Sequence, residues 1–158
     1  MGAEKKYIHE NYRTSVHEAG HAVVALAVGI NVERIENRAP FGGDVIYNLA
    51  DIHRATDFDQ LTKSVAGTVS ERLWYRDDRP INGAGTDYSD FENVKAWLSG
   101  YPAWQRDKVM ADATARAEKG IKYNSHIFDR FLDELLNSKQ INQSTINRIL
   151  NHQKLWKV

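Results

Sequence analysis

The sequence His17-Glu18-Ala19-Gly20-His21 constrains this chain most, because it places two imidazoles four residues apart inside an apolar stretch. Apart from the second histidine, residues 19–28 have only small or apolar side chains, which predicts a helix with a buried face. We expect this helix to begin at an N-cap supplied by Thr14 or Ser15 and to end at Gly29. Positions i and i+4 of a helix lie on one face, so the two imidazoles lie side by side.

This pair of histidines predicts a metal site. Burying an imidazole without a partner costs free energy, which favours a metal ion or a hydrogen-bonded site over chance spacing. Histidine is a common zinc ligand, and zinc with three protein ligands lowers the pKa of water to about 7. Glu18 directly follows His17 and is placed to accept the proton of that water. The pattern is therefore typical of a zinc hydrolase, with a coincidence of spacing as the alternative.

The composition limits the remaining choices. The chain has 158 residues, enough for one domain, and its 21 basic and 21 acidic residues cancel, so we expect no nucleic-acid partner. It contains no cysteine, which leaves histidine and carboxylate as zinc ligands. The apolar stretch at 19–30 is shorter than the roughly 20 residues that span a bilayer. We therefore expect no membrane anchor in this chain and a cytoplasmic location.

The hydrophobic pattern predicts a mainly α fold, a single domain over residues 1–158, with a small β-hairpin or sheet after the histidine helix. A long helix follows a capping box at Thr56 and runs through Tyr75. Gly67 lies in the middle of this long helix. We expect the backbone of the histidine helix to approach it closely there, with Gly20 as the contacting residue. The other expected elements are strands at 32–37 and 44–49, a loop at 76–86, and helices from about 87, at 104–120, at 125–137 and at 142–156.

A catalytic zinc site needs a third protein ligand, and Asp87 is the best candidate from its position. It follows a glycine-containing loop and stands at the expected start of a helix, where backbone amides favour an ionised carboxylate. An aspartate at this position is commonly only a helix cap, so both interpretations stay open on position alone.

Three segments, at 15–25, 66–75 and 83–88, resemble in order and approximate spacing the conserved blocks of the FtsH-type zinc peptidase domain. The likeness continues in residues 131–146, similar to the closing helices of that family. The resemblance implies a zinc-dependent endopeptidase in which His17, His21 and Asp87 bind one Zn²⁺ per chain. It also implies that Glu18 is the general base and that the substrate is a protein or peptide.

The chain also departs from that family. Glu71 is followed by Arg72, where the family has two adjacent acidic residues. Glu71 is expected either to orient a ligand histidine or to be an exposed helix charge. Members of the family carry a membrane segment and an ATP-driven unfoldase, whereas these 158 residues contain no phosphate-binding loop. We therefore expect cleavage of unfolded, flexible or docked segments without ATP, or help from a separate unfoldase.

Two further expectations concern how the chain works. The second predicted strand has two interpretations. As an edge strand beside the metal, it would let a substrate chain pair with its backbone. The alternative is an ordinary hairpin strand without a role in binding. Its candidate residues are Asp44, Val45, Ile46 and Tyr47. The alternative function is a regulatory or binding module that keeps the peptidase fold and the metal but has little or no activity.

Overall fold

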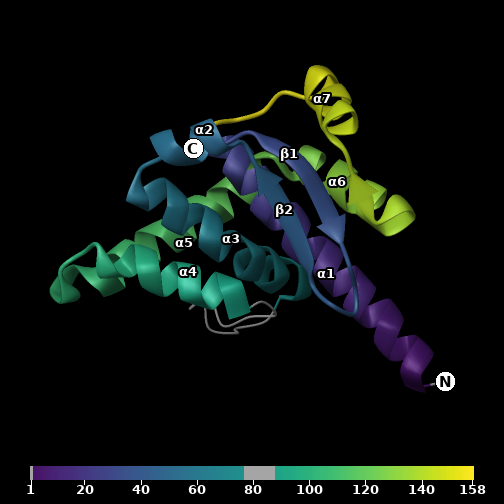
Figure 1. The fold of residues 1–158 in the computed structure, drawn as a ribbon, viewed down its shortest axis with the longest axis horizontal. Helices are drawn as coiled ribbons and strands as arrows, with labels where there is room; N and C mark the ends of the chain where they lie inside the picture. The colour runs from purple at the N-terminus through teal and green to yellow at the C-terminus, as the bar shows by residue number, and fades with distance from the viewer. Residues whose placement is uncertain (1, 77–87) are drawn as a thin grey trace.

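The computed structural model describes residues 2–76 and 88–158 and is mainly helical with a small sheet (Figure 1), which confirms the predicted fold class. Its helices are α1 (Gly2–Ala27), α2 (Leu49–Arg54), α3 (Asp57–Tyr75), α4 (Tyr88–Ser99), α5 (Arg106–Tyr123), α6 (Ser125–Ser138) and α7 (Gln143–His152), with a 3-10 turn, η1, at Ala103–Gln105. Its strands are β1 (Val32–Asn37), β2 (Gly43–Tyr47) and β3 (Gln140–Ile141).

The sheet is antiparallel, in the order β2-β1-β3, so that β2 is an edge strand within the described part of the chain. Ile35 in the central strand lies opposite Val45 on one side and Ile141 on the other, and all three side chains are buried. β2 ends at Tyr47, two residues earlier than predicted, because Asn48 caps α2 by accepting a hydrogen bond from the Asp51 amide. Both α2 and β3 are additions to the elements expected from the sequence.

The first helix is longer than expected, and the predicted N-caps are wrong. α1 begins at Gly2, so Thr14 and Ser15 lie inside it. The Ser15 hydroxyl instead accepts a hydrogen bond of 2.7 Å from the side-chain amide of Asn37, and this bond connects the helix to β1. The predicted end is confirmed, since the helix stops at Ala27 and Gly29 has a φ of +93°, a left-handed conformation that favours glycine.

α1 and α3 pack closely through small residues. A Cβ atom on Gly20 would lie 2.5 Å from the Ser70 Cβ and 2.8 Å from the Ala66 oxygen, so only glycine fits there. The expected close approach at Gly67 is present, but its neighbours are the imidazoles of His17 and His21 rather than Gly20. The crossing of these two helices therefore brings the paired histidines onto the backbone of α3.

The remaining helices surround this pair. α3 begins at the predicted capping box, in which Thr56 and Asp59 each bond the backbone amide of the other. α7 ends at His152, earlier than predicted, and the last residues run outside helix and strand to the end of α1, where the Val158 amide donates to the Ala27 carbonyl. Among the described helices, none is long and apolar enough to cross a membrane.

Candidate metal centre

Three side chains converge where α1, α3 and α4 meet. His17 and His21 come from the buried face of α1, and their Nε2 atoms lie 3.1 Å apart. Asp90, in the first turn of α4, places its Oδ2 atom 2.7 Å from the His17 Nε2 and 2.8 Å from the His21 Nε2. All three residues are buried, and together they can hold a metal ion. Ligand atoms of a tetrahedral zinc site are about 3.4 Å apart. The distances between these three ligand atoms would therefore each need to increase by less than about 1 Å.

The hydrogen-bonding pattern around the imidazoles fits a metal cation. The Nδ1 atom of His17 faces a Glu71 oxygen and that of His21 faces the Lys63 carbonyl oxygen, both at 2.8 Å. These oxygens only accept hydrogen bonds, so both Nδ1 atoms donate. In the neutral rings, both Nε2 lone pairs then face each other and the Asp90 carboxylate. Without a cation, these three acceptor atoms would lie against one another. Two added protons, one on each Nε2, would pair them but would create two adjacent imidazolium charges. One metal ion can bind all three atoms and avoids those charges.

Glu71 and Arg13 support this arrangement from outside. Glu71 is fully buried, which excludes the interpretation as an exposed helix charge. One of its oxygens bonds the Nδ1 of His17, and the other pairs with the guanidinium of Arg13. A carboxylate behind a ligand histidine fixes which ring nitrogen faces the metal. Glu71 therefore occupies the position that an orienting residue requires.

The local potential favours positive charge between these residues. Burial lowers the pKa of His17, but its hydrogen bonds to Asp90 and Glu71 outweigh burial and raise that pKa to about 10. Burial likewise opposes protonation of His21, and the Asp90 carboxylate raises its pKa. Burial would raise the pKa of Asp90, yet the two histidines hold it well below its usual range. The carboxylates that attract these protons also favour a divalent cation in their place.

The described residues offer a candidate third ligand, Asp90, in addition to the predicted Asp87. Asp87 lies outside the described residues, so its predicted ligation stays a prediction. Asp90 was not predicted as a ligand, although a signal for it exists. The triplet Ser89-Asp90-Phe91 repeats the hydroxyl-aspartate-aromatic pattern of Thr86-Asp87-Tyr88 three residues later. Two aspartates three residues apart are equivalent in this sequence pattern, and only the placement of α4 against α1 shows that Asp90 reaches the histidines.

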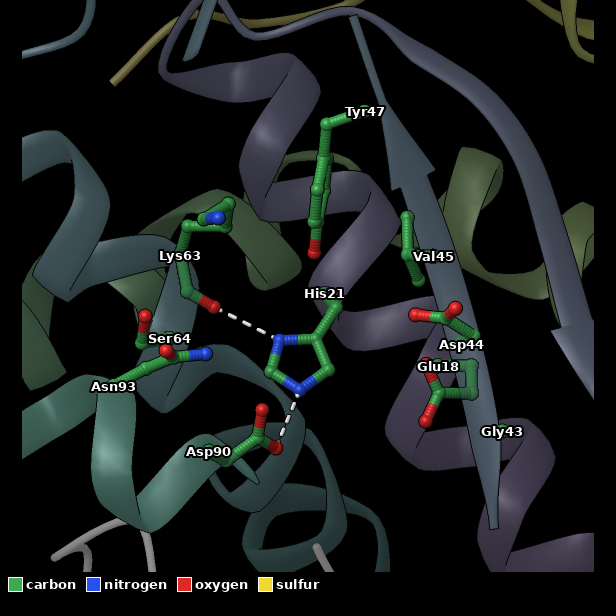
Figure 2. Close-up of a pocket in the computed structure, with 10 residues that line it drawn as sticks. All are labelled: Glu18, His21, Gly43, Asp44, Val45, Tyr47, Lys63, Ser64, Asp90 and Asn93. Carbon is green, nitrogen blue, oxygen red and sulfur yellow. Dashed lines mark hydrogen bonds and ion pairs between the residues drawn. The ribbon is translucent and has the colours of Figure 1, made fainter. Parts of the chain in front are cut away.

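A cavity of about 90 Å³ opens beside the three residues (Figure 2). Glu18 and His21 line it from α1, and β2 forms one wall. Glu18 is only 3% exposed, and a Cβ atom on Gly43 would lie 2.6 Å from its Cγ atom. The missing side chain at Gly43 therefore makes room for Glu18 between α1 and β2, where its carboxylate borders both the cavity and the candidate metal site.

The structure brings most of the predicted strand residues to this cavity. Asp44, Val45 and Tyr47 line it, whereas Ile46 lies on β2 but does not. The Tyr47 phenol points toward His21 (Figure 2). Burial, together with the nearby carboxylates of Glu18, Asp90 and Asp44, raises the pKa of this phenol well above its usual value. Tyr47 therefore offers a neutral hydroxyl group to the cavity.

Lys63 lies across the cavity from β2, and its ammonium group stacks over the Tyr47 ring, 4.2 Å from the centroid. Burial lowers the pKa of this lysine to about 8, with the Asp90 carboxylate acting in the opposite direction. The cavity thus has a cation on its helical wall and carboxylates at its floor and on the strand.

No protein-family profile matches the chain, and a search of curated proteins finds no match either.

Proposed function

We propose that this protein is a zinc-dependent endopeptidase. The observation that carries the proposal is the joint placement of His17, His21 and Asp90 around one point, with Glu18 beside them at a cavity bordered by β2, the edge strand of the described sheet. Each part occurs in proteins for other reasons. Their combination suits hydrolysis of an extended peptide, as the resemblance to FtsH-type peptidases also implies.

The metal is proposed to be zinc because of the ligand chemistry. Two imidazoles and one carboxylate are a ligand set found in catalytic zinc sites, which leave one position for water or substrate. Bound zinc supplies a polarising positive charge and makes water a nucleophile near neutral pH. His17 and His21 would bind through Nε2, and Asp90 through Oδ2. Glu71 and the Lys63 carbonyl would hold the two rings in the matching orientation.

The chain's own residues supply the proton transfer and the charge stabilisation. Glu18 would accept the proton of the attacking water and deliver it to the departing amine, as a general base and then a general acid. The Tyr47 phenol, which points toward His21, would donate a hydrogen bond to the oxyanion that forms on the substrate carbonyl. This route requires no covalent enzyme intermediate.

The substrate is proposed to bind as an added strand along β2. An edge strand has unpaired backbone groups that can hold an extended chain, and this one borders the cavity. Such a site accepts only segments that are already extended. We therefore propose unfolded, flexible or specifically docked protein segments as substrates, cleaved without ATP by this chain.

The experiment is a cleavage assay on casein, an unfolded protein, with zinc-loaded wild type and Glu18→Gln. We expect cleavage by wild type, a loss of at least about a thousandfold in Glu18→Gln, and zinc retained in both proteins. Glu118→Gln on α5, a partly exposed glutamate paired with Lys122, is the matched control and should cleave as wild type does. Equal cleavage by Glu18→Gln would refute the proposed base. Zinc retention without any cleavage by wild type would favour the regulatory or binding module instead.

A further inference from the structure

The helical wall of the cavity carries three side chains for which the proposed chemistry has no use. Lys63 and Ser64 come from α3 and Asn93 from α4, and they face β2 across the cavity (Figure 2). We call these three residues the donor wall. Each side chain offers at least one hydrogen-bond donor. Among the described residues, none of the three side chains has a hydrogen-bond or ion-pair partner.

Ser64 is the clearest sign that this wall binds something. Its side chain is buried, with 3% of the residue exposed, and its hydroxyl oxygen has no hydrogen-bond partner in the part of the chain that the structure describes. Most serines inside a helix can satisfy their hydroxyl on the carbonyl one turn back, as Thr62 does with Phe58. A buried polar group without a partner costs free energy unless a ligand or water pairs with it. Ser64 lines the cavity, so a group bound there would lie beside this side chain.

The positive charge of Lys63 indicates that the group bound at the donor wall is an anion. Its ammonium group contacts the face of the Tyr47 ring, which leaves its hydrogens without an acceptor of opposite charge among the described residues. The carboxylates that line the cavity belong to other surfaces: Glu18 and Asp90 border the metal site, and Asp44 lies on the strand wall. The donor wall therefore combines a cation with hydroxyl and amide donors, a set that pairs with an anion carrying two acceptor oxygens.

We propose that the donor wall is a substrate subsite that binds a carboxylate next to the cleaved bond, namely a glutamate or aspartate side chain. This inference rests on the proposed function. Side chains of a strand alternate between its two faces, so a peptide paired with β2 directs every second side chain toward the face where Tyr47 and Val45 point. The cavity of about 90 Å³ has room for a short acidic side chain above the metal site.

The first test is the specificity of the wild-type enzyme, which needs no variant. Cleavage sites in casein, mapped by mass spectrometry, define a peptide that is then made with Glu, Gln, Leu or Lys at each position flanking the cut. We expect one position at which Glu raises kcat/KM at least about tenfold over Gln, and Lys lowers it below Leu. Cleavage that is indifferent to charge at every flanking position would overturn the subsite.

The second test asks whether substitution of Lys63 changes the preference for Glu over Gln. Lys63→Met should reduce the Glu-over-Gln ratio to about one, and Lys63→Glu should reverse the preference toward Lys. Lys154→Met is the matched control, because Lys154 also stacks on an aromatic ring, that of Trp156 at 4.1 Å, but lies outside the cavity. Zinc content and melting temperature show whether each variant is folded. Folded Lys63 variants with an unchanged ratio would contradict the assignment.

The third test separates this inference from the proposed function. Binding of the same peptides to zinc-loaded Glu18→Gln is measured by calorimetry, so that hydrolysis is not needed. Tighter binding of the Glu peptide, by about tenfold, supports the subsite even if wild type cleaves nothing, and equal binding of all peptides opposes it even if wild type cleaves casein. Peptides with an amidated C-terminus distinguish the two sources of a carboxylate: unchanged affinity with an unchanged Glu-over-Gln preference assigns a side chain, whereas a loss of affinity shared by the Glu and Gln peptides assigns the chain end and overturns the side-chain proposal.

Discussion

Gly67 is the residue on which the spacing of the two imidazoles depends. A Cβ atom there would lie 2.5 Å from the His21 Nε2 and closer still to His17. Alanine normally stabilises a helix by about 1 kcal/mol over glycine, so helix propensity alone favours the substitution. The glycine is therefore explained by the rings that pack on it.

Gly67→Ala should push the imidazoles apart and weaken zinc binding at least about a hundredfold, although its helix propensity improves. Gly120→Ala on α5 is the matched control, because the added Cβ would make ordinary contacts of 3.5 Å or more with Val158, Val24 and Ala27. Competition with a chromophoric chelator measures both affinities. Unchanged zinc affinity in Gly67→Ala would show that the ion binds elsewhere.

Substitution of Glu71 tests whether the contact behind the His17 ring contributes to zinc affinity. Glu71→Gln removes the charge that faces both the His17 Nδ1 and the Arg13 guanidinium, so the ring loses part of its orientation. We expect zinc affinity to fall by about 10- to 100-fold, with secondary structure retained in circular dichroism. An affinity within about twofold of wild type would make Glu71 a folding residue without a role at the metal.

The residues of the candidate site differ in how far the sequence predicts them. His17, Glu18 and His21 lie within one turn and a half of one helix, so their relative placement follows from helix geometry alone. Asp90 reaches the Nε2 atoms from α4, and Glu71 reaches the opposite side of the His17 ring from α3. Their approach depends on how three helices cross, and local spacing carries no information on that crossing.

At the scale of elements, α2 connects the sheet to the start of α3. Asp51 of α2 accepts a hydrogen bond of 2.9 Å from the Asn31 amide just before β1. That bond, outweighing burial and helped by Arg54, lowers the pKa of Asp51 below its ordinary value of 3.8. Because the folded-state pKa is the lower one, ionised Asp51 stabilises the fold above about pH 4, and this stabilisation is lost as the pH falls through the lowered pKa.

Asp51→Asn should therefore lower the free energy of unfolding at pH 7, and the difference from wild type should shrink at pH 3. Urea titration of both proteins at the two pH values measures this, with circular dichroism as the check that each starts folded. A difference that is the same or larger at pH 3 would mean that the charge of Asp51 does not stabilise the fold.

Element boundaries were predictable where a local signal decides them. The capping box at Thr56 and the left-handed Gly29 are such signals, and both are confirmed. The start of α1 and the end of α7 depend on distant contacts instead. Ser15 bonds Asn37 rather than capping its own helix, and Asn124 holds the chain after α7 through both the amide and the carbonyl of Trp156.

At the scale of the whole molecule, α1 connects the core to the candidate metal site. Its buried side chains belong to one apolar cluster that also includes residues of α3, α5, α6 and the sheet. The chain after α7 returns to α1, where Lys157 donates to the Leu26 carbonyl and Val158 to that of Ala27. The helix that carries both histidines is thus held at many points, and a metal ion bound there stabilises the folded chain by mass action.

The measurement that tests the central claim most directly is the zinc content per chain of wild type, Asp90→Ala and Asp87→Ala, determined by elemental analysis after dialysis. The placement of Asp90 predicts one zinc ion per chain in wild type and a loss of binding in Asp90→Ala. Full loss in Asp87→Ala with retention in Asp90→Ala would assign the third ligand to Asp87. Absence of zinc from the wild-type protein, even after reconstitution with excess Zn²⁺, would contradict the metal centre itself.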